Sequence, residues 1–251
     1  MLKECNEFAT EIVVSFGSAR YDGATPEPDI SEMWGERDDM QNVSFVKYEV
    51  TKEIELNPLL HRPHAFWHNI SRIAGVSNLK SDADWILFLD GDEIPDGLAF
   101  KQWLETTALL HGCSYKLANY WYFRDVTHQA RQWEDSVILV SRTWFSKPDV
   151  GSYILMQDNE RDAIFQMLPG ERNIVHPVTK RPMFHHFSWV RSKQAMLAKV
   201  QNWGHRDDKD WKRLIEDAWE KPFDGTDFVH GYDYVTVENV FSIDVDSLPD
   251  A

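Results

Sequence analysis

Short runs of apolar residues predict the strands of this chain. Residues 11–16 and 43–50 are rich in β-branched and aromatic side chains, and residues 85–89 are apolar at every position between flanking acids. A run that is apolar throughout suits a strand that is covered on both faces, as in a parallel sheet. Strands are predicted at residues 11–16, 43–50, 85–89, 114–123, 136–144 and 173–178.

Helices are predicted where apolar residues recur every three or four positions. Residues 64–79 have this spacing, and so do Val200 and Trp203 in a segment that Ser192 can cap and Gly204 can end. Because strands and helices alternate in the first half, the pattern favours an α/β fold with a mostly parallel sheet. Helices are predicted at residues 64–79, 97–110, 158–168 and 192–204, and an irregular tail is predicted from about residue 221.

The length and composition indicate a folded protein with one main domain. The chain has 251 residues, and its 14 Phe, 11 Trp and 8 Tyr exclude disorder as the main state. We expect one main domain over residues 1–190. Residues 191–251 are expected to form a C-terminal helix and an acidic, aromatic tail that pack on the same domain.

The charge balance excludes some partners. The formal net charge of −15 argues against a nucleic-acid binder and against binding to anionic membranes. No apolar run is long enough to span a membrane, and the first residues lack a secretory signal. The two cysteines, Cys5 and Cys113, indicate neither a disulfide framework nor a zinc site, so a cytoplasmic location is expected.

Two aspartates directly after the most apolar strand carry the candidate chemistry. Asp90-Gly91-Asp92 follows residues 85–89, and ligands of open α/β sheets bind at the carboxyl ends of strands. Carboxylate oxygens suit Mn²⁺ or Mg²⁺, which also bind phosphate. The alternative is a polar turn, because Asp-Gly is a common turn pair. The flanking sequence favours the site over the turn.

The residues around this pair resemble a known family. Residues 71–93, which include Arg72, Gly75 and the Asp90-Gly91-Asp92 motif, resemble the helix–strand–DxD segment of GT-A-fold glycosyltransferases of the family 2 type. Residues 11–25 resemble that family's second strand and the Ser-x-Asp-Gly-Thr loop after it, which here includes Asp22. Residues 182–193 resemble the segment that supplies a metal-binding histidine. The resemblance covers about residues 5–205.

The resemblance implies a GT-A (Rossmann-like) fold with a mostly parallel twisted sheet, flanking helices and a C-terminal helical extension. Two departures accompany it. The chain starts at what looks like the helix after the family's first strand, so the fold is expected to be N-terminally shortened. The acidic pair that usually grips the base is replaced by Ser15-Phe16.

The resemblance also implies roles for individual residues. Adjacent strand residues face opposite sides, so only one of the two candidate histidines can reach a metal ion, and His186 is favoured over His185. Donor binding is assigned to Ser15, Arg72, Asp90, Gly91 and Asp92, and Mn²⁺ or Mg²⁺ binding to Asp92, Asp90, His186 and His185.

An inverting transfer needs a general base for the acceptor hydroxyl. Asp158 and Glu160 open a predicted helix, and Glu134 precedes a predicted strand, so these three acids are the candidates. Each could instead be a solvated acid or a helix-start carboxylate that complements the helix dipole. If no acid lies near the anomeric carbon, a retaining mechanism becomes possible.

The leading hypothesis is therefore a metal-dependent glycosyltransferase that uses a UDP-sugar. The acceptor would be a hydroxyl group of a glycan, a protein or a small molecule. One alternative is a non-catalytic module that binds a nucleotide-sugar or a glycan. A sugar nucleotidyltransferase ranks lower, because the chain shows no Gly-rich phosphate loop near its N-terminus. A metal-dependent phosphohydrolase is a further alternative for an Asp-Gly-Asp strand end.

Overall fold

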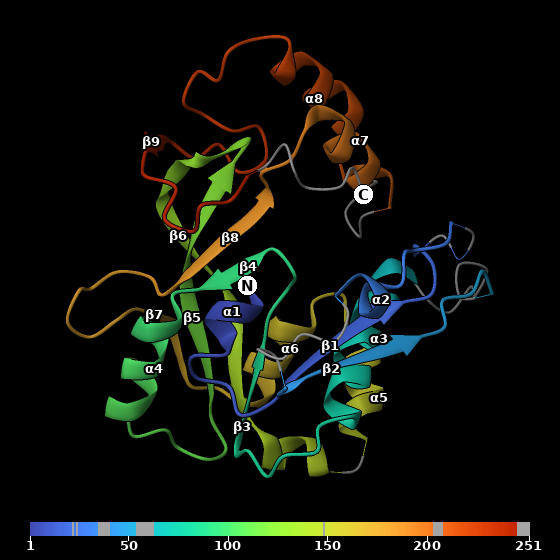
Figure 1. Cartoon of the computed structure of the whole chain (residues 1–251), viewed down its shortest axis with the longest axis vertical. Helices are drawn as coiled ribbons and strands as arrows, with labels where there is room; N and C mark the ends of the chain where they lie inside the picture. Colours follow the sequence, from blue (N-terminus) through green and yellow to red (C-terminus); the bar gives the residue numbers. More distant parts are fainter. Residues whose placement is uncertain are drawn as a thin grey trace.

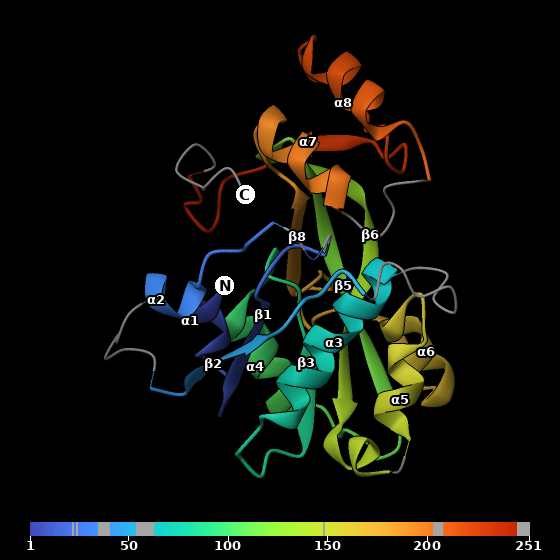
Figure 2. The ribbon, with the colours of Figure 1, turned by 90° about the vertical axis from the view of Figure 1, so that its right-hand side faces the viewer.

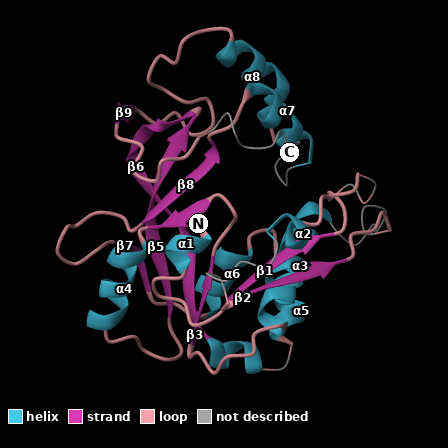
Figure 3. Cartoon of the chain, viewed as in Figure 1, coloured by secondary structure: helices cyan, strands magenta, loops and turns pink. Residues whose placement is uncertain are grey.

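Two separate sheets and their flanking helices form the fold (Figures 1 and 3). The computed structural model describes residues 1–21, 23, 25–34, 41–53, 63–147, 149–202 and 208–244. The smaller sheet pairs β1 (Ile12–Gly17) in parallel with β2 (Val43–Tyr48). The larger sheet contains β3 (Trp85–Phe88), β4 (Glu93–Pro95), β5 (Ser114–Phe123), β6 (Asp125–Ser141), β7 (Glu171–Ile174), β8 (Phe184–Trp189) and β9 (Tyr234–Thr236).

The larger sheet has the strand order β3-β6-β5-β8-β4, with β7 paired to β5 and β9 paired to β6. The helices lie around both sheets. They are α1 (Leu2–Cys5), α2 (Ile30–Trp34), α3 (Pro63–Ser77), α4 (Gly97–Thr106), α5 (Val150–Leu155), α6 (Glu160–Met167), α7 (Lys193–Asn202) and α8 (Trp211–Trp219), with a 3₁₀ turn at Arg142–Ser146.

The prediction of a mostly parallel sheet is wrong, because the larger sheet is mixed. Strands β3 and β6, β4 and β8, β5 and β6, and β6 and β9 all pair antiparallel. The reason lies in the link between β5 and β6, where Arg124 adopts a left-handed φ of 64° and Phe123 pairs with Asp125. A reversal this tight makes a hairpin, whereas a parallel pair needs a long crossover. The mixed α/β class itself is confirmed.

The predicted elements of the first half are confirmed with shifts of a few residues at their ends. Strand β6 begins at Asp125, eleven residues before the predicted start of that strand. The polar residues of its first half hid the strand from the search for apolar runs. Asp22, Trp203 and Gly204, which belong to the predicted loop and helix end, lie outside the described residues.

Strand β3 is an edge strand of the larger sheet, with different helices on its two faces. Ile86 and Phe88 pack with residues of α3, α5 and α6, whereas Leu87 packs with α4 through Phe100 and Trp103. Figure 2 shows α5 and α6 on one side of the sheet and α4 on the other. The prediction that this run is covered on both faces is therefore confirmed. No helix among the described residues is long and apolar enough to cross a membrane.

The C-terminal helices pack on the far end of the larger sheet. Figure 2 shows α7 and α8 at one end of the larger sheet. Met196 of α7 and Ile215 of α8 are fully buried in one cluster with Trp189 of β8 and Trp121 of β5. This packing places α7 and α8 on the sheet itself. The boundary at residue 190 stays a prediction.

Replacing Ile215 by Ala tests whether this extension unfolds together with the sheet. The side chain is 0% exposed, so the cavity should lower the free energy of unfolding by about 2–5 kcal/mol. Urea denaturation followed by tryptophan fluorescence and by far-UV circular dichroism measures it. The control is Lys212→Ala on the exposed face of α8, which should have little effect. Two separate transitions, with only one of them shifted, would show that the extension is an independent unit.

Candidate functional site

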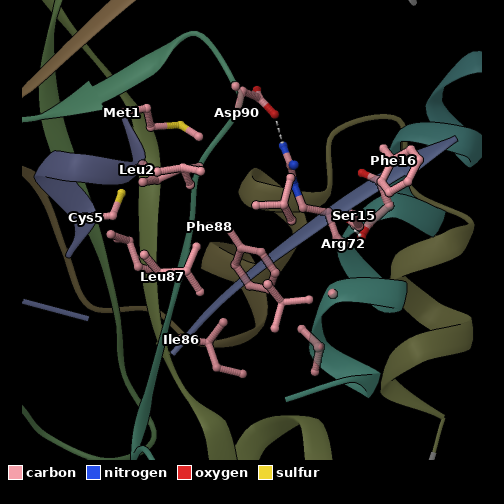
Figure 4. Close-up of a pocket in the computed structure, with 18 of the residues that line it drawn as sticks. Met1, Leu2, Cys5, Ser15, Phe16, Arg72, Ile86, Leu87, Phe88 and Asp90 are labelled. Carbon is pink, nitrogen blue, oxygen red and sulfur yellow. Dashed lines mark hydrogen bonds and ion pairs between the residues drawn. The ribbon is translucent and has the colours of Figure 1, made fainter. Parts of the chain in front are cut away.

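A cavity of about 1300 Å³ lies where β1 and β3 end. Figure 4 shows Ser15 and Phe16 on one side of it, with Arg72 reaching toward Asp90 beyond the end of β3. The polar end of the cavity is lined by Ser15, His68, Arg72, Asp90, Gly91, Asp92, Asp158, Arg191 and Lys199. All five residues predicted to bind the donor therefore lie along one cavity.

A local hydrogen-bonded turn fixes the Asp90-Gly91-Asp92 motif. The backbone N–H of Asp90 donates to Glu93 Oε2 at 2.7 Å, and the N–H of Glu93 donates to the carbonyl of Asp90 at 3.0 Å. Glu93 is fully buried and also accepts a hydrogen bond from Ser136 on β6. No atom lies within 4 Å of the place where a Cβ on Gly91 would sit. The turn leaves open space beside Gly91.

Two buried guanidinium groups hold Asp90. Arg72 pairs with Asp90 Oδ1, and Arg161 Nη2 lies 2.7 Å from Asp90 Oδ2. Arg72 also donates to Glu160 at 3.0 Å, and Arg161 donates to Glu93 at 2.7 Å. We call these residues, together with His68, the Asp90 network. His68 Nε2 lies 3.4 Å from Asp90 Oδ1. When His68 is protonated, Asp90 therefore has three positively charged neighbours.

The Asp90 network is balanced in charge. Burial would raise the pKa of Asp90, but Arg161 and Arg72 outweigh it and hold that pKa well below its usual range. Burial and Arg72 would lower the pKa of His68, yet Asp90 and Glu160 raise it to about 9. At neutral pH Asp90 is therefore ionised and His68 is protonated, and the network also pairs Glu93 with Arg161 and Glu160 with Arg72.

Asp92 has a different environment with an excess of positive charge. His186 Nε2, Arg191 Nη2 and Lys199 Nζ lie 3.5, 3.5 and 3.6 Å from its carboxylate. We call these four residues the Asp92 cluster. Burial lowers the pKa of Lys199, although Asp92 opposes the shift. An arginine, a lysine and a histidine thus surround one carboxylate, and Arg191 and Lys199 both line the cavity.

The two adjacent histidines face opposite sides of β8, as alternation along a strand predicts. His186 lies beside Asp92, whereas His185 is buried, stacks on Tyr122 and hydrogen-bonds its hydroxyl at 2.7 Å. Burial lowers the pKa of His185 to about 4. Only His186 is therefore near the motif. The metal-binding roles of both histidines stay predictions.

The three candidate bases occupy different places. Asp158 lines the cavity. Glu160 is buried in the Asp90 network. Burial would raise the pKa of Glu160, but Arg72 and His68 hold that pKa below its usual range. Glu134 pairs with His230 at 3.5 Å and does not line the cavity, and burial raises its pKa. Geometry therefore separates the three, while the catalytic role of each stays a prediction.

The side chains that the sequence predicts as metal ligands, in the arrangement that the structure gives them, do not fit a divalent cation. Both oxygens of Asp90 contact guanidinium groups, and Arg191 and Lys199 flank the carboxylate of Asp92. Within the described ranges, no group of three or more His, Cys, Asp or Glu residues could hold a metal ion. The expected Mn²⁺ or Mg²⁺ therefore stays a prediction from the sequence.

Sequence reasoning missed His68, Arg161 and Lys199. His68 precedes Arg72 by four residues on the predicted helix, and this spacing already places the two on one face. Arg161 stands between the acids of a cluster that drew attention to its carboxylates. Lys199 lies beside the apolar face of α7, and nothing in its local sequence distinguishes it from a surface lysine.

The fold and the cavity define a mixed α/β protein with ionic side chains at the ends of its strands. No protein-family model matches the chain, and no curated protein matches its sequence. Among solved structures, the glycosyltransferase GlyE from Streptococcus pneumoniae TIGR4 is similar, with a TM-score of 0.37 and 9% sequence identity. The match covers 87% of this chain and 58% of that chain. A TM-score of this size shows neither a family nor an activity for this chain.

Replacing Arg161 by Met tests the Asp90 network. Loss of the guanidinium leaves the buried carboxylate of Glu93 without its cation, so the free energy of unfolding should fall by about 3–5 kcal/mol. Urea denaturation measures the change. The control, Arg172→Met, breaks an ion pair to Asp135 in which the arginine is exposed, and it should cost about 0–1 kcal/mol. Equal effects of the two variants would contradict the assignment.

Proposed function

We propose that this protein transfers a sugar from a nucleotide-diphosphate donor, a UDP-sugar, to a hydroxyl group of a glycan, protein or small-molecule acceptor. The observation that supports it most is the excess positive charge of the Asp92 cluster on the wall of the cavity. The whole chain has a formal charge of −15, so a concentrated cationic site in a cavity favours an anionic ligand. The position at the end of β3 supports the same assignment.

Arg191 and Lys199 are the groups that we expect to bind the diphosphate. Arginine can bind two phosphate oxygens through its planar fork, and lysine adds a compact point charge. When the bond between sugar and phosphate breaks, negative charge develops on the leaving diphosphate. Fixed cations at that place stabilise this charge without reorganising. Asp92 then holds the two cations in position before the donor arrives.

Asp90 has a positioning role in this proposal, because its two oxygens are bound to arginines. It fixes the motif relative to α3 and α6. Ser15 completes the opposite wall, where its hydroxyl donates to the carbonyl of Ser71 at 2.6 Å. None of these steps depends on the metal ion that the sequence predicts.

Asp158 is the acid that we propose as the general base. It lines the cavity, whereas Glu160 is committed to Arg72 and its pKa is lowered, which weakens it as a base. A base on one side of the sugar and a diphosphate on the other correspond to an inverting transfer.

Replacing Lys199 by Met should weaken UDP binding at least tenfold, because one phosphate-binding cation is lost. Isothermal titration with UDP, CMP and GDP, each with Mn²⁺ and with EDTA, measures the affinity, the nucleotide preference and the metal dependence together. The control is Lys212→Met, at a lysine that is exposed on α8. Wild-type protein that is folded but binds no nucleotide would refute the proposal.

Replacing Asp158 by Asn should leave UDP affinity within about twofold and lower the rate of donor turnover by about 10²–10⁴-fold, the usual contribution of a general base. Release of UDP from a UDP-sugar measures the turnover. If the wild-type protein binds the donor but neither transfers nor hydrolyses it, the chain is a nucleotide-sugar-binding module. A variant with wild-type turnover would exclude Asp158 as the base.

A further inference from the structure

The C-terminal extension brings two aromatic side chains to the end of the larger sheet. Strand β9 pairs with β6 (Figure 1), and the loop directly before β9 carries His230 and Tyr232. The rings of these two residues stack, with their centroids 4.9 Å apart and an angle of 28° between their planes. They therefore present one aromatic surface, and neither residue lines the cavity.

A carboxylate of β6 lies at the edge of this aromatic surface. Glu134 Oε1 lies 3.5 Å from His230 Nδ1, and the hydroxyl of Tyr232 donates to the same oxygen at 3.4 Å. The described residues provide no hydrogen-bond partner for the other oxygen, Oε2. The side chains of Glu134 and His230 are 21% and 32% exposed, so a ligand can reach both.

The indole of Trp121 connects this group to the Asp92 cluster. The centroid of its ring lies 4.7 Å from that of His230 and 4.9 Å from that of His186, with an edge-to-face arrangement in each pair. His186 Nε2 in turn lies 3.5 Å from Asp92 Oδ1, and Asp92 lines the cavity. We give the name Glu134 site to the group of Glu134, Trp121, His230 and Tyr232. This site therefore adjoins the Asp92 cluster directly.

A buried aspartate fixes the loop that carries the two stacked rings. The carboxylate of Asp227 accepts hydrogen bonds of 2.6–3.3 Å from the backbone N–H groups of residues 229–232. It also accepts one of 2.9 Å from the hydroxyl of Tyr234. Gly231 has a φ of 75°, a left-handed conformation that glycine adopts readily. The loop is thus ordered without a ligand, which reduces the entropy that binding would cost.

The charges of the Glu134 site differ from those of the Asp92 cluster. Burial raises the pKa of Glu134, whereas His230 and His186 oppose this shift. Among the described residues, no lysine or arginine forms an ion pair with Glu134. The Asp92 cluster, by contrast, contains an arginine and a lysine. The Glu134 site therefore suits a ligand with neutral hydrogen-bond donors and not a phosphate.

A sugar ring has the two kinds of surface that this site complements. The C–H groups on one face of a pyranose are apolar and pack on aromatic rings, while the hydroxyl groups at its rim donate hydrogen bonds. A carboxylate can only accept hydrogen bonds, so Glu134 Oε2 selects a ligand that offers such donors. A sugar on the Glu134 site would also lie next to the cations that we expect to hold the donor diphosphate.

We propose that the Glu134 site binds a sugar unit of the acceptor, so that the acceptor is a glycan. This inference rests on the proposed function for the word acceptor, whereas the binding of a carbohydrate to the site does not depend on it. His230 and Tyr232 provide the stacking surface, and Glu134 accepts hydrogen bonds from the ring hydroxyls. Glu134 is then an acceptor-binding residue, and the general base remains Asp158.

Carbohydrate binding by the intact chain without nucleotide tests the proposal. The probes are the methyl β-glycosides of glucose, galactose and N-acetylglucosamine, together with cellobiose and lactose. Saturation-transfer difference NMR detects binding and identifies the ring protons that contact the protein. We expect saturable, millimolar binding of at least one probe, with the strongest saturation on the C–H groups of one ring face.

Two variants locate the sugar. Tyr232→Ala should weaken binding about two- to tenfold, the range that corresponds to loss of an aromatic contact. Its control is Trp133→Ala, because Trp133 is 45% exposed but contacts Tyr120 instead of the Glu134 site. Glu134→Gln should weaken binding several-fold, and its control is Glu105→Gln on the exposed face of α4. Far-UV circular dichroism verifies that each variant is folded.

A kinetic measurement separates this proposal from the proposed function. With a UDP-sugar as donor and the bound carbohydrate as acceptor, Glu134→Gln should raise the KM for the acceptor several-fold. The affinity for UDP should stay within about twofold, whereas Lys199→Met has the opposite pattern. Carbohydrate binding without any UDP binding would refute sugar transfer and leave the carbohydrate site in place.

Three outcomes would overturn the proposal. Absence of saturable binding of every probe by the folded protein would show that the site does not hold a sugar. Unchanged binding by Tyr232→Ala and Glu134→Gln, or equal weakening by Trp133→Ala, would place the sugar elsewhere. Binding of tetramethylammonium but of none of the sugars would show that the rings and the carboxylate hold a cation.

Discussion

The contact between Asp90 and two buried arginines is the interaction on which the site depends. Arg72 comes from α3, Arg161 from α6, and Glu93, which shares Arg161, begins β4. Two helices that are distant from each other in sequence, and the strand that follows the motif, are thus fixed around the end of β3. Each of these charges would be costly to bury alone, and the arrangement is tolerable because every carboxylate has a cation and Glu93 also accepts hydrogen bonds from Ser136 and from the backbone of Asp90.

This balance explains why the carboxylates of Asp90 and Asp92, which one glycine separates, differ in the charge of their surroundings. Asp90 belongs to a network in which three negative and three positive groups offset each other. Asp92 faces Arg191, Lys199 and His186, so the surroundings of Asp92 keep a positive excess. The excess is local, because the whole chain is strongly acidic. An anionic ligand would offset it, and the cavity beside it has room for one.

The same cavity extends from this polar end along the apolar side chains of β1 and β3, and the topology explains why. The smaller sheet is attached through α3, whose residues pack under β1 and also under the face of β3 that carries Ile86 and Phe88. Packing of the helix therefore holds the two sheets next to each other without hydrogen bonds between β1 and β3. The polar end and the apolar part between β1 and β3 are two parts of one space.

The sequence by itself determined the positions of most strands and helices of the first half, because apolar runs and helical spacing record which faces are buried. It also located the Asp90-Gly91-Asp92 motif and the alternation of His185 and His186. Only the tertiary structure decided that the sheet is mixed, because the hairpin at Arg124 depends on one backbone conformation. Likewise, only the structure placed Arg161 and Lys199 beside the two aspartates, since electrostatic partners are set by distance in space and not by distance along the chain.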